Sequence, residues 1–331
     1  MRKMMILTVI AVVAIALGGC SPSQPTATPT PPAPEKITLA MGYIPNVQFA
    51  PFYVAVEKGY FAEENIAVEF DYGWETDILK LVGTGELSFA VASGDQVILA
   101  RSQGLPVVYV LNWYRRFPVC VVSLKEKGIR EPQDLVGKTV GIPATYGASY
   151  IGWRALLSAA GIEEAAVNLV AIGYTQVAAL TEGRVDAAVC YAMNEPVQLR
   201  EAGHEVNVIY VADYANLISN GLITNERTIA QRPDLVRGLV RAFLRGLRDT
   251  LDHPDEAFEV CRRFVPEIDE GNEALQKAVL VESTAFWQGE ALGRSDPAAW
   301  EESQRLMRQI GLLDAEVPVE KLFTNEFVKS Q

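Results

Sequence analysis

Short apolar segments alternate with longer amphipathic ones from residue 37 to residue 211 of this 331-residue chain. Glycine, proline or polar turns bound the short segments, as is typical of buried strands, and the segments between them have helical spacing. This β-α-β-α order predicts an α/β fold whose mostly parallel sheets are covered by helices on both faces. We expect strands at residues 37–41, 67–72, 87–92, 106–111, 119–124, 139–142, 167–171, 186–190 and 206–211.

The strands fall into two similar units in series, which predicts two lobes. A helical third follows, in which a long amphipathic segment begins at Pro233. These last helices need a sheet to cover, and the first lobe offers one. We therefore expect the chain to cross between lobes twice, near residues 117–119 and 214–221, and a ligand cleft to lie between them. The expected divisions are residues 37–118 for the first lobe, 119–213 for the second, and 214–331 for the return to the first lobe with the C-terminal helices.

Composition removes several classes of function. The formal net charge is −12, with 41 acidic and 29 basic side chains, so a nucleic-acid-binding surface is not expected. Only two histidines are present, His204 and His253, which argues against histidine-rich metal sites and histidine-based catalytic triads. We expect no metal, no cofactor and no catalytic residues.

The N-terminus reads as an export signal. Arg2 and Lys3 precede an apolar run over residues 4–17, too short to span a bilayer. The run ends in Leu17-Gly18-Gly19-Cys20, which resembles a bacterial lipobox and implies cleavage before Cys20 and lipidation of its thiol. An ordinary signal with a chance cysteine is the alternative. We expect residues 1–19 to be the signal peptide and residues 20–36 a lipidated Pro/Thr-rich tether, which places the protein on the extracytoplasmic face of the cell membrane.

Three further cysteines, Cys120, Cys190 and Cys261, lie among apolar residues. Their odd number and the lack of a C-x-x-C pattern favour buried thiols over a disulfide framework. One bridge in the interior stays open as the alternative, because an exported protein meets oxidising conditions.

The loops that follow the expected strands carry the candidate site. Ligands of open α/β sheets bind beyond the C-terminal ends of the strands, and here these loops hold aromatic and neutral hydrogen-bonding side chains. Such walls suit a flat, neutral heterocycle. An anion is the alternative, bound by Arg115 and Arg116 or by free N–H groups near a helix start at Ser149. The candidate ligand-binding residues are Tyr43, Asn46, Phe49, Ser93, Trp113, Tyr146, Tyr174, Tyr191, Asn194 and Glu195.

Five sequence blocks resemble one known family. They cover residues 42–46, 52–61, 85–94, 134–141 and, in the last block, 183–187 with 194–196. They are similar to blocks of solute-binding proteins for thiamine-precursor pyrimidines, riboflavin and related nutrients. The resemblance implies a periplasmic-binding-protein type II fold, and an ABC permease with its ATPase as partners. It is strongest to the riboflavin-binding lipoprotein branch, and Tyr43 stands where many pyrimidine binders have tryptophan.

The expected function is that of a membrane-anchored solute-binding protein for a vitamin-type heterocycle, with riboflavin first. A hydroxymethyl- or formylamino-pyrimidine is the alternative ligand. The family also includes enzymes that make the thiamine pyrimidine from a histidine and pyridoxal phosphate. The cleft loops of this chain hold no histidine, so we expect no enzyme. A sensor module that feeds a signalling partner is the third alternative.

Overall fold

Two five-stranded mixed sheets form the framework of the computed structural model, which describes residues 33–328. In each sheet one strand, β10 or β5, runs antiparallel to both of its neighbours. The first sheet has the order β2-β1-β3-β10-β4, with β1 Glu35–Met41, β2 Ile66–Tyr72, β3 Phe89–Ser93, β4 Val107–Asn112 and β10 Asn220–Asn225. The second has the order β7-β6-β8-β5-β9, with β5 Val119–Leu124, β6 Thr139–Ile142, β7 Asn168–Ala171, β8 Ala187–Tyr191 and β9 Val206–Tyr210. The expected α/β architecture is confirmed.

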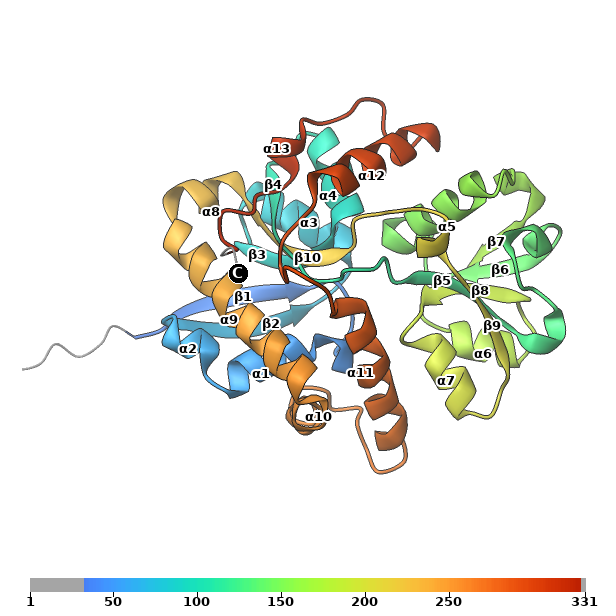
Figure 1. The fold of residues 1–331 in the computed structure, drawn as a ribbon, viewed down its shortest axis with the longest axis horizontal. Coiled ribbons are helices and arrows are strands. Elements are labelled where there is room, and N and C mark those ends of the chain that lie inside the picture. The colour runs from blue at the N-terminus through green and yellow to red at the C-terminus, as the bar shows by residue number, and fades with distance from the viewer. Residues whose placement is uncertain (1–32, 329–331) are drawn as a thin grey trace, which may run out of the picture. The chain divides into compact units, whose positions relative to one another are not determined.

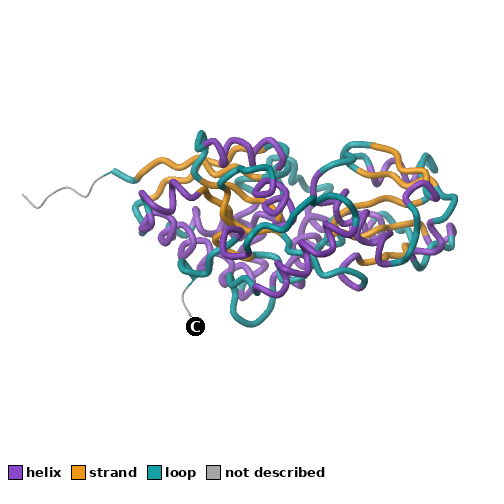
Figure 2. The backbone as a smooth tube through the Cα atoms, turned by 90° about the horizontal axis from the view of Figure 1, so that it is seen from above, coloured by secondary structure: helices purple, strands orange, loops and turns teal. Residues whose placement is uncertain are grey.

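Helices cover both faces of each sheet, and Figures 1 and 2 show the strands in two groups with helices around each. Alternation along a strand explains this coverage: Phe89 and Val91 of β3 face one apolar core, whereas Ala90 and Ala92 face the other. The helices of the first sheet are α1 Ala50–Glu57, α2 Tyr60–Glu63, α3 Glu75–Thr84 and α4 Gly94–Ser102. Those of the second are α5 Gly147–Ala159, α6 Gln176–Thr181 and α7 Glu195–Glu201.

The C-terminal helices pack mainly around the first sheet. Helix α9 lies along α1 and α2, while α12 and α13 pack on α4. Phe323, just after α13, forms a β-bridge to Tyr109 at the edge of β4. These helices are α8 Glu226–Gln231, α9 Pro233–Asp252, α10 Pro254–Cys261, α11 Glu273–Trp287, α12 Pro297–Gln309 and α13 Val319–Leu322.

Two connections join the sheets. The chain leaves the first sheet after Asn112 and enters the second at Val119, then leaves it after Tyr210 and returns at Asn220. We call the parts built on the two sheets the first and second lobes. The connections are tied to each other, because Arg116 in one donates to Asp213 in the other at 2.7 Å. The lobe divisions at 118/119 and 213/214 remain our proposal.

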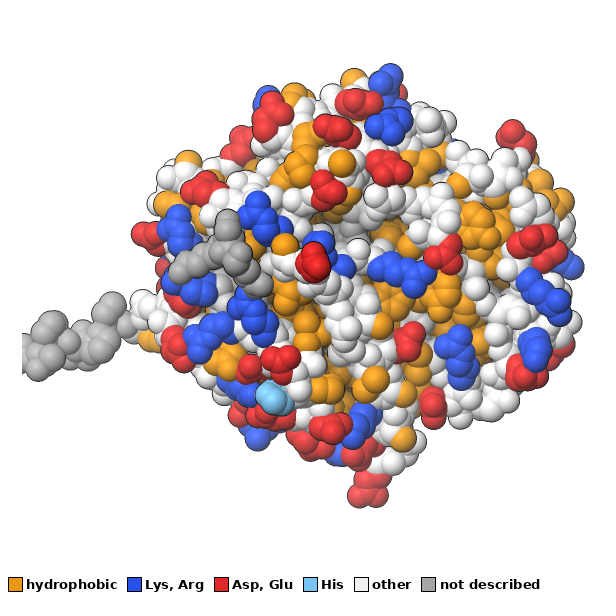
Figure 3. Space-filling view, in the orientation of Figure 1, with side chains coloured by type: hydrophobic (Ala, Val, Ile, Leu, Met, Phe, Trp, Pro, Cys, Tyr) orange, Lys and Arg blue, Asp and Glu red, His pale blue; other side chains and the backbone are white. Residues whose placement is uncertain are grey.

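The expected signal peptide, Cys20 and most of the tether lie outside the described residues. From residue 33 to residue 328, no helix is long and apolar enough to cross a membrane. Acidic and basic side chains are interspersed on the face of the molecule seen in Figure 3.

Candidate ligand-binding site

A cavity of about 950 Å³, which includes space open to solvent, lies where the strand ends of the two sheets meet. The first lobe contributes Gly42, Tyr43, Gln48, Phe49, Trp74, Glu75, Thr76, Val91, Trp113, Tyr114 and Asn220. The second contributes Pro143, Ala144, Tyr146, Gly147, Ala148, Ser149, Tyr174, Gln176, Cys190, Tyr191, Asn194 and Glu195. Most of them follow the C-terminal end of a strand, as expected for this class of sheet.

Three half-exposed aromatic side chains surround the open end of the cavity, and we call them the aromatic mouth: Trp74, Tyr146 and Tyr174. Their exposed fractions are 40%, 52% and 40%. The rings of Trp74 and Tyr174, from different lobes, are stacked with centroids 5.1 Å apart and planes 16° apart. The ring centroid of Tyr146 lies 5.9 Å from that of Trp74. Large aromatic surfaces left in water beside a cavity are suited to stack on a flat ligand.

Deeper aromatic residues belong to the protein core as well as to the cavity. Trp113 is only 1% exposed and packs among Phe52, Phe243 and Trp287. Tyr43 meets Tyr174 edge to face at 4.9 Å. Trp113 therefore shapes the cavity floor, while Tyr43 joins that floor to the aromatic mouth.

Glu195 is a buried acceptor in the second lobe. It opens α7 ahead of Pro196, where proline is favoured at the start of a helix, and its residue is 6% exposed. Oε1 accepts from Asn194 Nδ2 at 3.2 Å, whereas Oε2 has no hydrogen-bond partner among the described residues. Burial raises the pKa of Glu195 to about 7. A ligand N–H would satisfy the unpaired oxygen.

Glu75 is a second carboxyl group in the cavity, and it was not among the candidate residues expected from the sequence. Glu75 begins α3 just after the loop that follows β2. Its Oε1 accepts from both the N–H and the Oγ–H of Ser93, the latter at 2.7 Å. Burial raises the pKa of Glu75, although the two bonds from Ser93 oppose the change.

The cavity brings together most of the candidate residues but not all. Tyr43, Phe49, Trp113, Tyr146, Tyr174, Tyr191, Asn194 and Glu195 line it. Asn46 does not: its side chain accepts from Gln48 N–H at 2.9 Å and caps the short 3-10 helix Val47–Phe49. Ser93 does not either, since it is fully buried behind Glu75. Both short polar side chains satisfy local backbone or carboxyl groups instead of facing the cavity.

In the structure, the two arginines expected to bind an anion are bonded to other groups. Arg115 donates to the carbonyl of Arg294 at 2.8 Å, and Arg116 is paired with Asp213. Among the lining residues of the described chain there is no Lys, Arg or His. The helix does not start at Ser149 as the sequence suggested, because α5 begins at Gly147 with Tyr146 at the cap. The first turn of α5 still faces the cavity through Gly147, Ala148 and Ser149.

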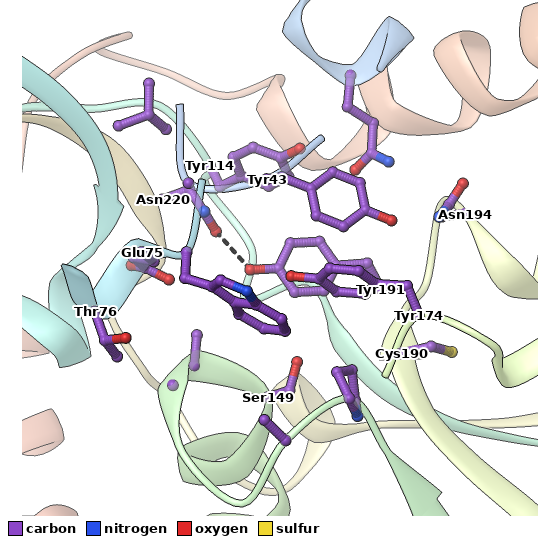
Figure 4. Close-up of a pocket in the computed structure, with 18 of the residues that line it drawn as sticks. Tyr43, Glu75, Thr76, Tyr114, Ser149, Tyr174, Cys190, Tyr191, Asn194 and Asn220 are labelled. Carbon is purple, nitrogen blue, oxygen red and sulfur yellow. Dashed lines mark hydrogen bonds between the residues drawn. The ribbon is translucent and has the colours of Figure 1, made fainter. Parts of the chain in front are cut away.

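The residues that sequence reasoning missed come mainly from one loop. Trp74, Glu75 and Thr76 follow β2, at the same sheet edge as the other loops. The strand-end rule that found the other loops applies equally to this one. Asn220 could not be found in this way because it starts β10, a strand that the sequence did not reveal. Figure 4 shows it accepting from the Tyr191 hydroxyl, at 3.2 Å, which joins the two lobes across the cavity.

The described residues give no sign of a metal site, since residues 33–328 hold no group of three or more His, Cys, Asp or Glu side chains arranged to bind an ion. Cys120 and Cys190 face each other across β5 and β8, with Sγ atoms 3.5 Å apart, and both are free thiols. Cys261 is buried and free as well. The arrangement as a whole can stack on a flat ring and accept hydrogen bonds from it.

Solved structures with the same chain path define the class of fold. The alkanesulfonate-binding protein SsuA from Xanthomonas axonopodis pv. citri, bound to MOPS, superposes with a TM-score of 0.71 at 13% identity. The match covers 88% of this chain and 99% of that chain. The fold is thus that of the periplasmic binding proteins, as the resemblance implied.

The chain belongs to the NMT1/THI5-like family, whose model matches residues 46–257. It is 47% identical to the riboflavin-binding protein RibY of Chloroflexus aurantiacus, over 99% of each chain. It is 31% identical to a formylaminopyrimidine-binding protein of Halalkalibacterium halodurans, over 85% of each. It is 25% identical to the 4-amino-5-hydroxymethyl-2-methylpyrimidine phosphate synthase of Legionella pneumophila, over 89% of this chain and 92% of that protein.

Proposed function

We propose that this chain is the extracytoplasmic solute-binding protein of an ABC importer and that its ligand is riboflavin. The observation that supports this most strongly is the cavity itself. It is lined by aromatic side chains from both lobes, contains two carboxyl groups and has no lining cation among the described residues. Such a cavity favours a flat, uncharged ring with hydrogen-bond donors over an anion. Full-length 47% identity to a protein named for riboflavin binding supports the same ligand.

The flavin ring and the cavity are complementary in chemistry. Each aromatic side chain that stacks on the ring stabilises the complex by about 0.5–1.5 kcal/mol beyond the burial of its surface. The imide N–H of the isoalloxazine is a donor, and Glu195 Oε2 is an acceptor without a partner among the described residues. A hydrogen bond to a charged group contributes about 1.5–3 kcal/mol, so Glu195 is suited to select the ring that is bound.

The formylaminopyrimidine alternative has one specific observation in its favour, the 31% identical binding protein named for it. Synthase relatives at 25% identity raise an enzymatic alternative. We propose no enzymatic activity, because the described lining residues offer neither a lysine for a pyridoxal cofactor nor a histidine to consume.

Mass spectrometry of the small molecule released from protein purified without added ligand tests the proposal, followed by calorimetric titration. We expect a released flavin, a yellow preparation, and tighter binding of riboflavin than of formylaminopyrimidine. Release of a pyrimidine, with no heat on titration of riboflavin, would overturn the riboflavin assignment. Turnover of added pyridoxal phosphate would establish the enzyme instead.

We also propose that Cys20 carries the lipid anchor, with residues 20–36 as tether to the membrane. The support is the sequence Leu17-Gly18-Gly19-Cys20 after a short apolar run. Cys20→Ser should block lipidation and release the protein from the membrane fraction. Labelling with radioactive palmitate in the native host checks this, with Cys261→Ser as the matched control that should stay labelled. A labelled Cys20→Ser variant would refute the anchor.

A further inference from the structure

Behind the cavity wall, one serine hydroxyl lies between two carboxyl groups. Ser93 Oγ is 2.7 Å from Glu75 Oε1 and 2.5 Å from Asp95 Oδ1. Asp95 Oδ1 also accepts from Gln96 N–H at 2.6 Å. Ser93 and Asp95 are fully buried, and no cation lies in contact with the three side chains among the described residues. The three side chains thus form a closed, uncompensated acidic group.

Counting protons shows that one of the two carboxyl groups is a neutral acid. Ser93 has a single hydroxyl proton, yet its oxygen lies within hydrogen-bond distance of both carboxyl oxygens. A hydroxyl donates to one acceptor and accepts from another donor, so one carboxyl group must supply that second proton. Two adjacent buried carboxylates without a cation would also repel each other strongly.

The proton belongs on Asp95 because the two carboxyl groups have different surroundings. Glu75 accepts two hydrogen bonds from Ser93 and lines the cavity, where water or a ligand reaches it. Asp95 has no access to the cavity, and its Oδ2 has no partner among the described residues. Burial raises the pKa of Asp95 to about 8, and the neighbouring Glu75 adds to the increase. The chain of donation therefore runs from Asp95 to Ser93 to Glu75.

This order leaves Glu75 as an ionised acceptor facing the cavity from the first lobe. Glu195 faces it from the second lobe, and Figure 4 shows Glu75 and Thr76 on the opposite side of the tyrosines from Asn194. Thr76, Ser149 and Asn220 add neutral polar groups to the lining. A ligand that satisfies both ends must carry donors at both ends of a flat ring.

We propose that Glu75, held by Ser93 and the neutral acid Asp95, binds the hydroxyl groups of the ligand's side chain, while Glu195 binds the ring imide. This rests on the proposed function and extends it to the orientation of the flavin. It assigns to Glu75 the recognition of a polyhydroxylated tail and the rejection of tails that carry a phosphate. Flavin mononucleotide, with its anionic tail, should be excluded by the carboxylate, because no cation lines the cavity within residues 33–328.

Calorimetric titrations with riboflavin, lumiflavin and flavin mononucleotide test this orientation; lumiflavin has the same ring with a methyl group in place of the tail. The wild-type chain should bind riboflavin at least about tenfold more tightly than lumiflavin. Glu75→Gln should weaken riboflavin by about 10- to 100-fold, leave lumiflavin unchanged and reduce the discrimination against flavin mononucleotide. Asp77→Asn is the matched control: this exposed carboxyl group on the same helix α3 does not line the cavity, so all three affinities should persist.

Infrared spectroscopy tests the proton itself. The difference between wild type and Asp95→Asn at pH 7 should contain the carbonyl stretch of a protonated carboxylic acid, and its absence would overturn the assignment of the proton. Equal wild-type affinity for riboflavin and lumiflavin, or equal weakening of both by Glu75→Gln, would overturn the recognition of the tail. If the wild-type chain binds no flavin at all, the proposed function fails first and this inference fails with it.

Discussion

Asp95 shows how a single buried carboxyl group couples the stability of this fold to pH. Its ordinary pKa of 3.8 is raised to about 8 in the folded chain. Between these two values the folded state holds a proton that the unfolded state has released. The free energy of unfolding therefore falls as pH rises from about 4 to about 8.

Asp95→Asn should remove that dependence. The amide has nearly the same shape but cannot ionise, so the free energy of unfolding of the variant relative to wild type should rise by roughly 2–5 kcal/mol between pH 4 and pH 9. Urea unfolding across this range measures the difference. The raised pKa of Glu195 also makes the free energy of unfolding fall as pH rises to about 7. This effect is the same in both proteins, so it cancels in their difference. Parallel curves at all pH values would contradict the prediction.

Glu195 should make binding itself depend on pH. Its pKa is raised to about 7, so its acceptor carboxylate becomes populated as pH rises through neutrality. Riboflavin affinity should therefore increase between pH 6 and pH 8, whereas Glu195→Gln should bind more weakly and without this slope. The expected loss at pH 8 is about 1.5–3 kcal/mol.

An N3-methylated flavin is the ligand-side control, because it lacks the imide N–H. Calorimetry should show that Glu195→Gln hardly changes its affinity. If Glu195→Gln weakens binding of the methylated flavin as much as binding of riboflavin, Glu195 acts on the turn before Pro196 and does not contact the imide.

At the scale of single elements, helix α9 depends on one close crossing. A Cβ built on Gly246 would lie 2.1 Å from the carbonyl oxygen of Pro51 and 2.8 Å from the Cβ of Ala55, both in α1. Neither backbone nor Cβ can move away without shifting the whole helix. Gly238, on the same helix, would place its Cβ 3.2 Å from the Cβ and 3.3 Å from Oε2 of Glu64, contacts that a shift of a few tenths of an ångström would relieve.

Gly246→Ala should therefore destabilise the fold by about 1–3 kcal/mol, the usual range for overpacking in a core. Gly238→Ala is the matched control, and it should be neutral or gain up to about 1 kcal/mol from its helix propensity. Thermal and urea unfolding of the two variants provide the comparison. A stable Gly246→Ala protein would show that α9 and α1 can separate at little cost.

Most elements could be predicted from the sequence, because strands buried on both faces appear as short apolar runs between turns. The strand at residues 119–124 was expected where β5 lies, for example. Strand β10 was not, since Asn220 and Gly221 precede only two apolar residues, and the partners that make it a strand, β3 and β4, lie more than 100 residues earlier. The pairing of β10, antiparallel between β3 and β4, depends on tertiary contacts, and the local sequence pattern does not indicate it.

The candidate site, like the fold, was only partly predictable from the sequence. Aromatic residues after strands were predictable because the strand-end rule depends only on the order of elements. Whether a polar side chain faces the cavity depends on its neighbours. Asn46 and Ser93 form hydrogen bonds with Gln48 and Glu75 instead of facing the cavity. The acid pair of Glu75 and Asp95 joins residues from two helices, α3 and α4, and no single sequence window contains it.

At the scale of the whole described molecule, the lobes touch at more than the cavity. Arg154 of α5 donates to the carbonyl of Ile310, just after α12, at 2.6 Å. Helix α11 also packs against α7. At the cavity, Trp74 of the first lobe contacts both Tyr146 and Tyr174 of the second. A flat ligand must separate these rings before it can stack on them, so the aromatic mouth should control the rate of binding as well as its strength.

Trp74→Ala should change association and affinity in opposite directions. Removal of two ring contacts, each worth about 0.5–1.5 kcal/mol, should speed association of riboflavin by at least about 5-fold, because fewer contacts must break to admit it. The complex loses a stacking partner, so dissociation should accelerate further and affinity should fall. Stopped-flow measurement of flavin fluorescence separates the two rates, with Trp74→Phe as the control that retains a ring and should stay near wild type. Slower or unchanged association in Trp74→Ala would mean that ligand reaches the cavity without parting the mouth, and that Trp74 acts only on the bound state.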